Sequence, residues 1–207
     1  LEEGVIGLND TVNCTGVYKE ITPSLKCWIY PGQHGPLDVV HGIQNSCNVF
    51  FSEMGHRLSM DENGNYSPEL GIEKIRKYAS MFGLDETSGI EIAEREPQMT
   101  TEKPEASSIG QGKNSYSNVQ LSRYITAVAN KGTVYKLSLL DKMTDSQGNL
   151  LKDFTPEIRS TIDVKDSTWN AVHTGMRQVL PRNLKTDTGL TTHSLFPLPR
   201  IRIRRSR

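Results

Sequence analysis

Residues 45–51, Asn-Ser-Cys-Asn-Val-Phe-Phe, restrict the possible fold and function of this chain most. They place a polar Ser-Cys-Asn triplet directly before an apolar run. Ser46 and Asn48 alternate with Cys47, so in a turn or loop the first two would share one face and Cys47 would point the opposite way. A hydroxyl beside a carboxamide supplies a proton relay and an amide-orienting group, and both are useful in acyl transfer. The simpler interpretation is a helix over residues 49–58 that Ser46 or Asn48 caps. Taken alone, the triplet favours the cap.

Hydrophobic spacing predicts that helices dominate the first two thirds of the chain. Helices are expected over residues 37–43, 49–58, 68–82 and 119–130, and a last helix begins at a cap formed by Asp166 or Ser167. The residues expected to face inward on the last two helices are Leu121, Ile125, Val128 and Ala129, then Trp169, Val172, Met176 and Val179. Two strands, over residues 133–140 and 150–154, flank a turn at residues 146–149 and predict a hairpin.

Length and charge limit the functions open to the chain. Its 207 residues suffice for one domain with a sizeable core, or for one domain plus an arm. Residues 1–180 hold 17 basic and 23 acidic residues, a net charge of −6, so no nucleic-acid surface is expected. No apolar run approaches the roughly 20 residues that cross a bilayer, and the chain does not begin with a signal-peptide pattern.

Several short sequence motifs surround the Ser-x-Asn triplet. They are Leu1-Glu2-Glu3-Gly4, Asn13-Cys14-Thr15-Gly16-Val17-Tyr18, Lys26-Cys27-Trp28, Gly32-Gln33-His34-Gly35 and Ile109-Gly110-Gln111-Gly112. Together with Ser46-Cys47-Asn48, their order and spacing resemble the transpeptidase domain of class B penicillin-binding proteins, over roughly residues 1–180. These enzymes cross-link bacterial peptidoglycan and carry three motifs, Ser-x-x-Lys, Ser-x-Asn and Lys-Thr-Gly.

The resemblance implies an α/β (α+β) fold of the penicillin-binding protein and serine β-lactamase type, in which a helical subdomain packs on an antiparallel sheet. This chain would hold mostly the helical subdomain and an incomplete sheet. By resemblance, Ser46 passes a proton between the nucleophilic serine, its lysine and the leaving amine. Asn48 would donate its amide to the substrate carbonyl and help to hold the lysine. The helix that carries the nucleophile and its lysine would end near Gly4, so both would lie upstream of Leu1 and this fragment alone would be inactive.

The same resemblance implies substrates, partners and location. The enzyme would form an acyl-enzyme with the D-Ala-D-Ala end of a stem peptide, and β-lactams would acylate it. It would need no cofactor for catalysis, and it would act beside a membrane glycosyltransferase in a cell-wall synthesis complex. An anchor outside this chain would hold the domain on the extracytoplasmic face of the bacterial cell membrane.

Two other functions remain open. A serine β-lactamase relative shares the motifs but needs a deacylating water, and the cysteine-rich loop and Gly110-Gln111-Gly112 argue against it. A β-lactam sensor, or a degenerate penicillin-binding scaffold, would bind without turnover.

The chain departs from the family at the third motif. Lys185-Thr186-Asp187-Thr188-Gly189 places two residues between Thr186 and the glycine, which changes the register a strand would need, so no catalytic role is transferred. The composition also turns basic from Pro181 onward. Our hypothesis is that residues 181–207 are disordered or out of frame, and the alternative is a basic arm for acidic lipid or nucleic acid.

Three cysteines and one histidine form a second candidate site. They are Cys14, Cys27, His34 and Cys47, with the spacing Cys-x12-Cys-x6-His-x12-Cys. The set suits a closed tetrahedral Zn²⁺ site, and a metal behind Cys47 would fix the backbone that presents Ser46 and Asn48. One alternative is a disulfide, Cys14–Cys27 or Cys27–Cys47, with a spare thiol, and another is inert buried thiols. Zinc is preferred because it uses all three cysteines and explains His34.

Single residues outside these groups receive structural interpretations. Trp28 is expected to anchor the core of its loop, in preference to stacking on a sugar. Gly110-Gln111-Gly112 is too short for a phosphate cradle, so nucleotide binding is not expected. His41, His56 and His173 lie on expected helices and have no partner set for triad chemistry.

Overall fold

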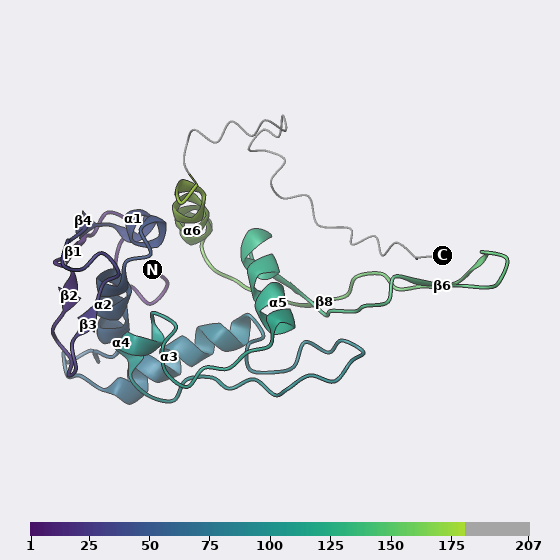
Figure 1. Ribbon diagram of the computed structural model, residues 1–207, viewed down its shortest axis with the longest axis horizontal. Coiled ribbons are helices and arrows are strands. Elements are labelled where there is room, and N and C mark those ends of the chain that lie inside the picture. The colour runs from purple at the N-terminus through teal and green to yellow at the C-terminus, as the bar shows by residue number, and fades with distance from the viewer. Residues whose placement is uncertain (181–207) are drawn as a thin grey trace.

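The computed structural model describes residues 1–180 of the chain. Their helices are α1 (Val39–Gln44), α2 (Asn48–Leu58), α3 (Pro68–Met81), α4 (Pro104–Ser107), α5 (Asn118–Ala129) and α6 (Asp166–Gln178). Their strands are β1 (Val12–Cys14), β2 (Val17–Tyr18), β3 (Leu25–Lys26), β4 (Gly35–Leu37), β5 (Thr133–Tyr135), β6 (Lys142–Thr144), β7 (Leu150–Asp153) and β8 (Ile158–Thr161). Elements β1 to β4 gather with α1 and α2 at one end of the molecule, and the ribbon of β6 and β7 extends toward the other (Figure 1).

Strand pairing among residues 1–180 consists of two-stranded antiparallel ladders. β1 pairs with β4, β2 with β3, β5 with β8 and β6 with β7. The expected turn is correct, and β7 lies within the expected strand over residues 150–154. The expected pairing is wrong, because β7 pairs with β6, which lies outside the expected strand over residues 133–140. The first part of that strand, β5, pairs instead with β8, and Thr133 lies opposite Thr161. Helices combined with short antiparallel ladders confirm an α+β fold with an incomplete sheet.

The helix boundaries follow the capping residues. α3 begins where Ser67 accepts a hydrogen bond from the amide of Leu70, and it ends before Gly83, which has a φ of +74°. α5 begins with a reciprocal capping box between Ser117 and Gln120. The expected cap of α6 is wrong, because Lys165 occupies that position and its side chain forms no capping bond. None of the helices within the described residues combines the length and apolarity that a bilayer crossing needs.

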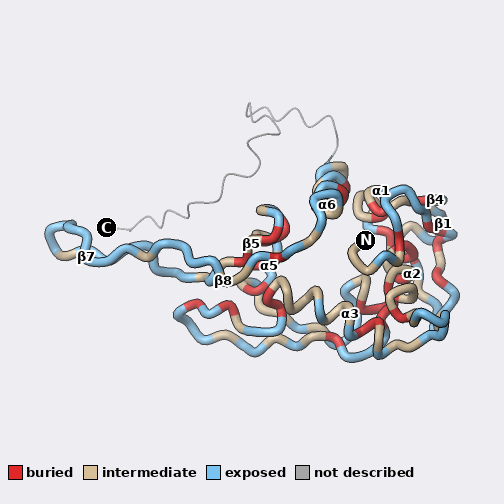
Figure 2. Tube along the Cα trace, turned by 180° about the vertical axis from the view of Figure 1, so that it is seen from behind, coloured by how far each residue is buried: buried red, intermediate tan, exposed pale blue. Residues whose placement is uncertain are grey.

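The larger buried cluster surrounds the start of α2. Its members come from the first 50 residues, with one residue from α6: Ile6, Val12, Cys14, Tyr18, Cys27, Leu37, Val39, Cys47, Val49, Phe50 and Ala171. α6 reaches this cluster by packing on α1 at Gly175, where a Cβ would lie 2.7 Å from the Cβ of Ile43. Only glycine permits this approach. Figure 2 shows buried positions concentrated at this end, while the β6–β7 ribbon is exposed.

A second, smaller cluster joins α5, β5 and α6. It consists of Ala127, Val134, Ile162 and Trp169, and Phe82 packs against it. The inward faces expected from the sequence are partly wrong. On α5, Leu121 and Ile125 are 40% and 48% exposed, and on α6 both Met176 and Val179 are exposed. Other residues of α5 face inward instead, because backbone carbonyls of the neighbouring loop need hydrogen-bond donors.

Arg123 supplies those donors. It is 2% exposed, and its guanidinium donates to the carbonyls of Gly83 and Thr87 and of other residues in the same loop. Gln120, also fully buried, donates to the carbonyl of Glu86. Hydrogen bonding of a loop backbone therefore determines which face of α5 is buried.

Candidate functional site

Ser46 occupies the turn between α1 and α2 in a conformation that disfavours L-residues. Its φ is +46°. The amide of Ser46 donates to the carbonyl of Ile43 at 3.0 Å and that of Cys47 to the carbonyl of Gly42 at 3.1 Å, which is a Schellman ending of α1. Glycine usually fills this left-handed position, because a Cβ costs about 1–2 kcal/mol there. The Ser46 side chain is exposed, so burial does not account for a Cβ at this position.

Asn48 begins α2 and is half-buried. Its Nδ2 donates to the backbone carbonyl of Lys26 at 3.0 Å. The helix cap is Cys47, whose Sγ accepts from the amide of Phe50 at 3.4 Å. The interpretation of Ser46 or Asn48 as the cap is therefore wrong, and neither side chain is committed to capping. Cys47 is fully buried next to the exposed Ser46, so the triplet alternates between solvent and core.

Trp28 flanks the same turn from outside. Its Nε1 donates to the backbone carbonyl of Asn45 at 2.8 Å. The expectation that Trp28 anchors the loop core is wrong, since the side chain is 64% exposed. The sequence does not predict this hydrogen bond or the one from Asn48 to the Lys26 carbonyl. Lys26-Cys27-Trp28 is, however, one of the short motifs that carry the family resemblance.

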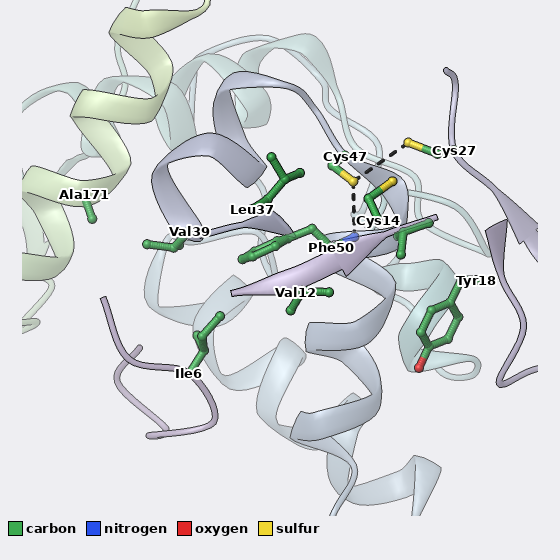
Figure 3. Close-up of a cluster of buried hydrophobic side chains, with 11 residues drawn as sticks. Ile6, Val12, Cys14, Tyr18, Cys27, Leu37, Val39, Cys47, Phe50 and Ala171 are labelled. Carbon is green, nitrogen blue, oxygen red and sulfur yellow. Dashed lines mark hydrogen bonds between the residues drawn. The ribbon is translucent and has the colours of Figure 1, made fainter. Parts of the chain in front are cut away.

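The four candidate metal ligands converge behind the turn. Cys14 ends β1, Cys27 follows β3, His34 precedes β4 and Cys47 precedes α2. Their ligand atoms all lie within 4.8 Å of one another. The three cysteines are buried and have free thiols. Figure 3 shows the three sulfurs gathered together, next to Phe50 and the apolar core.

Three distances in this cluster match a tetrahedral zinc centre. Zn–S bonds of about 2.3 Å and Zn–N bonds of about 2.0–2.1 Å place two sulfurs about 3.8 Å apart, and sulfur and nitrogen about 3.5 Å apart. The sulfurs of Cys27 and Cys47 are 3.9 Å apart, and His34 Nδ1 lies 3.5 Å from Cys14 Sγ and 3.6 Å from Cys27 Sγ. The opposite ring atom, His34 Nε2, is buried and has no hydrogen-bond partner among the described residues. The residues present therefore fit Zn²⁺.

Two thiols of the cluster differ in how readily they ionise. Burial raises the pKa of Cys47 to about 12. Burial opposes ionisation of Cys27 as well, but backbone N–H groups, including those of Ile29 and Asn48, outweigh it and lower the pKa of this thiol. Thiolates this close repel one another, so the set would ionise together only around a bound cation.

A buried acid that the sequence does not indicate joins α2 to α4. Glu105 is 2% exposed and accepts a hydrogen bond from the Tyr66 hydroxyl at 2.9 Å, with His56 Nδ1 at 3.3 Å. Its backbone carbonyl accepts from the Ser52 hydroxyl at 3.3 Å. These hydrogen bonds hold α2 against α4. They agree with a structural role for His56. The candidate third motif, residues 185–189, and the rest of the basic tail lie outside the described residues.

Sequence comparisons bear on the chain as a whole. The family described as "Penicillin binding protein transpeptidase domain" matches residues 1–194, a match that extends past Pro181. Penicillin-binding protein 2A of Bacillus subtilis is 26% identical over 200 residues, which cover 86% of this chain and 26% of that protein. Stage V sporulation protein D of the same organism is 30% identical over 118 residues, which cover 54% of this chain and 16% of that protein. The chain thus spans about a quarter or less of these curated relatives.

Solved structures share the fold. Penicillin-binding protein 2B from Streptococcus pneumoniae strain R6 superposes with a TM-score of 0.67 at 21% identity, over 86% of this chain and 31% of that one. A chain from the structure described as "Structural coordination of polymerization and crosslinking by a peptidoglycan synthase complex" gives a TM-score of 0.71 at 21% identity, over 86% of this chain and 30% of that one.

Proposed function

We infer that the whole protein cross-links peptidoglycan as a serine-type D,D-transpeptidase, because this chain belongs to the transpeptidase-domain family of penicillin-binding proteins. The observation that carries the proposal within this chain is the exposed Ser46, which is held in a left-handed turn and separated from Asn48 by one residue. A hydroxyl beside a carboxamide supplies a proton relay and an amide donor, both of which acyl transfer uses. The nucleophilic serine and its lysine are assigned to the part of the whole protein outside this chain.

The proposed reaction proceeds through an acyl-enzyme. The serine oxygen bonds to the carbonyl carbon of the penultimate D-alanine of a stem peptide, the C–N bond breaks, and terminal D-alanine leaves as the amine. Ser46 relays the proton from the nucleophile toward that amine. An acceptor amine from a second stem peptide then attacks the ester, forms the cross-link and returns the proton to the serine.

Asn48 orients the substrate in this scheme. One N–H of its amide is already bound to the Lys26 carbonyl. An amide has two N–H donors and an acceptor oxygen, so one N–H remains for the substrate carbonyl and Oδ1 remains for the catalytic lysine.

The proposal extends to partners and location. β-Lactams would acylate the same serine, because opening of the lactam amide imitates cleavage of the peptide. The whole protein would act with a membrane glycosyltransferase in a cell-wall synthesis complex, on the extracytoplasmic face of the bacterial membrane. The comparison with a peptidoglycan synthase complex supports this assignment through the shared fold alone.

A fluorescent penicillin tests the proposed function on the full-length protein. We expect one serine to be labelled covalently, and S46A and N48A each to slow acylation by about 100-fold or more, in keeping with the loss of a proton relay or an orienting group. A folded protein that takes no label would instead be a degenerate scaffold. Rapid release of hydrolysed label would indicate a β-lactamase.

We also propose that Cys14, Cys27, His34 and Cys47 hold a structural Zn²⁺. The support is the match of three of their distances to a tetrahedral centre and the burial of all three thiols. Four protein ligands fill the coordination sphere, so the ion would serve structure and leave no open position for a reacting water. It would join β1, the segment after β3, the segment before β4 and the start of α2.

Elemental analysis of the purified protein tests the zinc site. We expect about one zinc ion per chain, released when the thiols are modified by a mercurial reagent. Metal-free protein with an intact Cys27–Cys47 or Cys14–Cys27 disulfide would reject the zinc site in favour of the disulfide alternative.

A further inference from the structure

Trp28 is held in place although most of its side chain is in solvent. It is 64% exposed, so burial does not fix it. Two contacts do: its Nε1 donates to the Asn45 carbonyl at 2.8 Å, and its ring meets that of His34 edge-on, with centroids 5.3 Å apart and an interplanar angle of 62°. One side chain therefore joins a candidate zinc ligand to the residue that precedes Ser46.

The carbonyl that Trp28 binds belongs to the peptide group between Asn45 and Ser46. Rotation of that group changes ψ of Asn45 and φ of Ser46 together, so a hydrogen bond that fixes the carbonyl also fixes the left-handed φ of +46°. Asn45 is the C-cap of α1, and its carbonyl is one of the acceptors that the helix end leaves without an intrahelical partner. The indole N–H satisfies this acceptor.

Residues 26–28 contact the motif at two further points. The carbonyl of Lys26 accepts from Asn48 Nδ2 at 3.0 Å, and Cys27 Sγ lies 3.9 Å from Cys47 Sγ. The segment thus contacts residues 45, 47 and 48, on both sides of Ser46.

We propose that Trp28 is a positioning residue for transpeptidation, which directs the Ser46 hydroxyl by fixing the Asn45–Ser46 peptide group. The proposal rests on the function proposed above. It requires no contact between Trp28 and the substrate, because the indole acts through the backbone. Its edge contact with His34 links the metal cluster to the turn, so residues 26–28 connect the two sites.

Amide hydrogen exchange on the full-length protein tests this positioning without any activity. W28F keeps an aromatic ring but removes the N–H. We expect the amides of Ser46 and Cys47 to exchange about tenfold faster or more in W28F, while the Phe82 amide at the end of α3 keeps its wild-type rate. W169F, which changes the other tryptophan of the sequence, is the matched control and should leave Ser46 and Cys47 unaffected. Unchanged exchange at Ser46 and Cys47 in W28F would overturn the proposal.

Acylation kinetics of the full-length protein then test the catalytic role. W28F should lower the rate constant of acylation by penicillin about tenfold, since a misplaced relay group slows chemistry. The dissociation constant of the complex that precedes acylation and the zinc content should not change. Acylation of W28F at the wild-type rate would overturn the role of Trp28 but leave the proposed function standing. Loss of zinc and of helix α1 in W28F would also overturn this role, because Trp28 would then be needed for folding. A wild-type protein that penicillin does not acylate would refute the proposed function itself.

Discussion

Replacing Ser46 with glycine separates the two properties that the structure assigns to this residue. Its backbone has a φ of +46°, and its side chain is exposed. Glycine adopts the left-handed conformation without steric cost, so S46G relieves about 1–2 kcal/mol of backbone strain. It also removes the hydroxyl that the proposed mechanism uses. Stability and activity should therefore move in opposite directions.

The magnitude depends on the unfolded state as well. Glycine gains backbone freedom on unfolding, which costs about 0.5–1 kcal/mol, so the net gain for S46G is about 0.5–1 kcal/mol. In a chain of this size that raises Tm by about 1–4 °C. S46A retains a Cβ, so its stability should equal that of wild type. Acylation of the full-length protein by penicillin should fall by about 100-fold or more in both variants.

Lys131 provides a matched control. It is another non-glycine residue in the left-handed region, with a φ of +61°, in the turn after α5. K131G also removes the exposed contacts of Lys131 with Asn170 and Asp166, so its gain in stability should be no larger than that of S46G, and acylation should be unchanged. Thermal unfolding in which S46G is less stable than S46A would refute the strain argument, and an S46G protein that is acylated at the wild-type rate would refute the relay role.

Three further predictions concern the cluster, the acid response and α5. C47S keeps a good helix cap for α2 but replaces a proposed zinc ligand, so zinc content by elemental analysis should fall below about half an ion per chain while α2 remains helical by NMR. Hydrogen bonds from Lys77 and then Tyr78 lower the pKa of Glu3, so this carboxylate stabilises the fold above its unfolded pKa of about 4.3, and the contribution is lost as pH falls through the folded pKa. E3Q should therefore unfold at a lower urea concentration than wild type at pH 7 and differ less near pH 3; an equal difference at both would contradict this. R123K leaves several buried loop carbonyls without donors and should lose about 2–4 kcal/mol in urea unfolding, whereas R95K on the surface should lose none.

Local sequence patterns predict α1, α2, α3, α5 and α6 because their signals lie within a few residues, whereas the single turn of α4 is not predicted. The boundaries of α3 follow from Ser67, Pro68 and Gly83, and the period of the apolar residues between them. Long-range strand pairing leaves no such signal, so the sequence predicts the wrong partner for β5. The inward face of α5 was also misassigned, because hydropathy cannot show that a loop backbone needs the donors of Arg123.

The site divides in the same way. Residue type and spacing alone brought Cys14, Cys27, His34 and Cys47 into one set, and the structure places their ligand atoms together. The backbone conformation of Ser46 could not be predicted, since serine is uncommon in left-handed turns. The contacts made by residues 26–28 could not be predicted either, because they involve backbone carbonyls of residues about 20 positions away in the sequence.

A crystal structure of the full-length protein acylated by benzylpenicillin would test the central claim most directly. Our account predicts an ester on a serine contributed from outside this chain, with Ser46 Oγ and Asn48 Nδ2 each within about 3.5 Å of a polar atom of the acyl group, the nucleophile or its lysine. An acylated serine with Ser46 and Asn48 beyond hydrogen-bond reach of all these groups would contradict it.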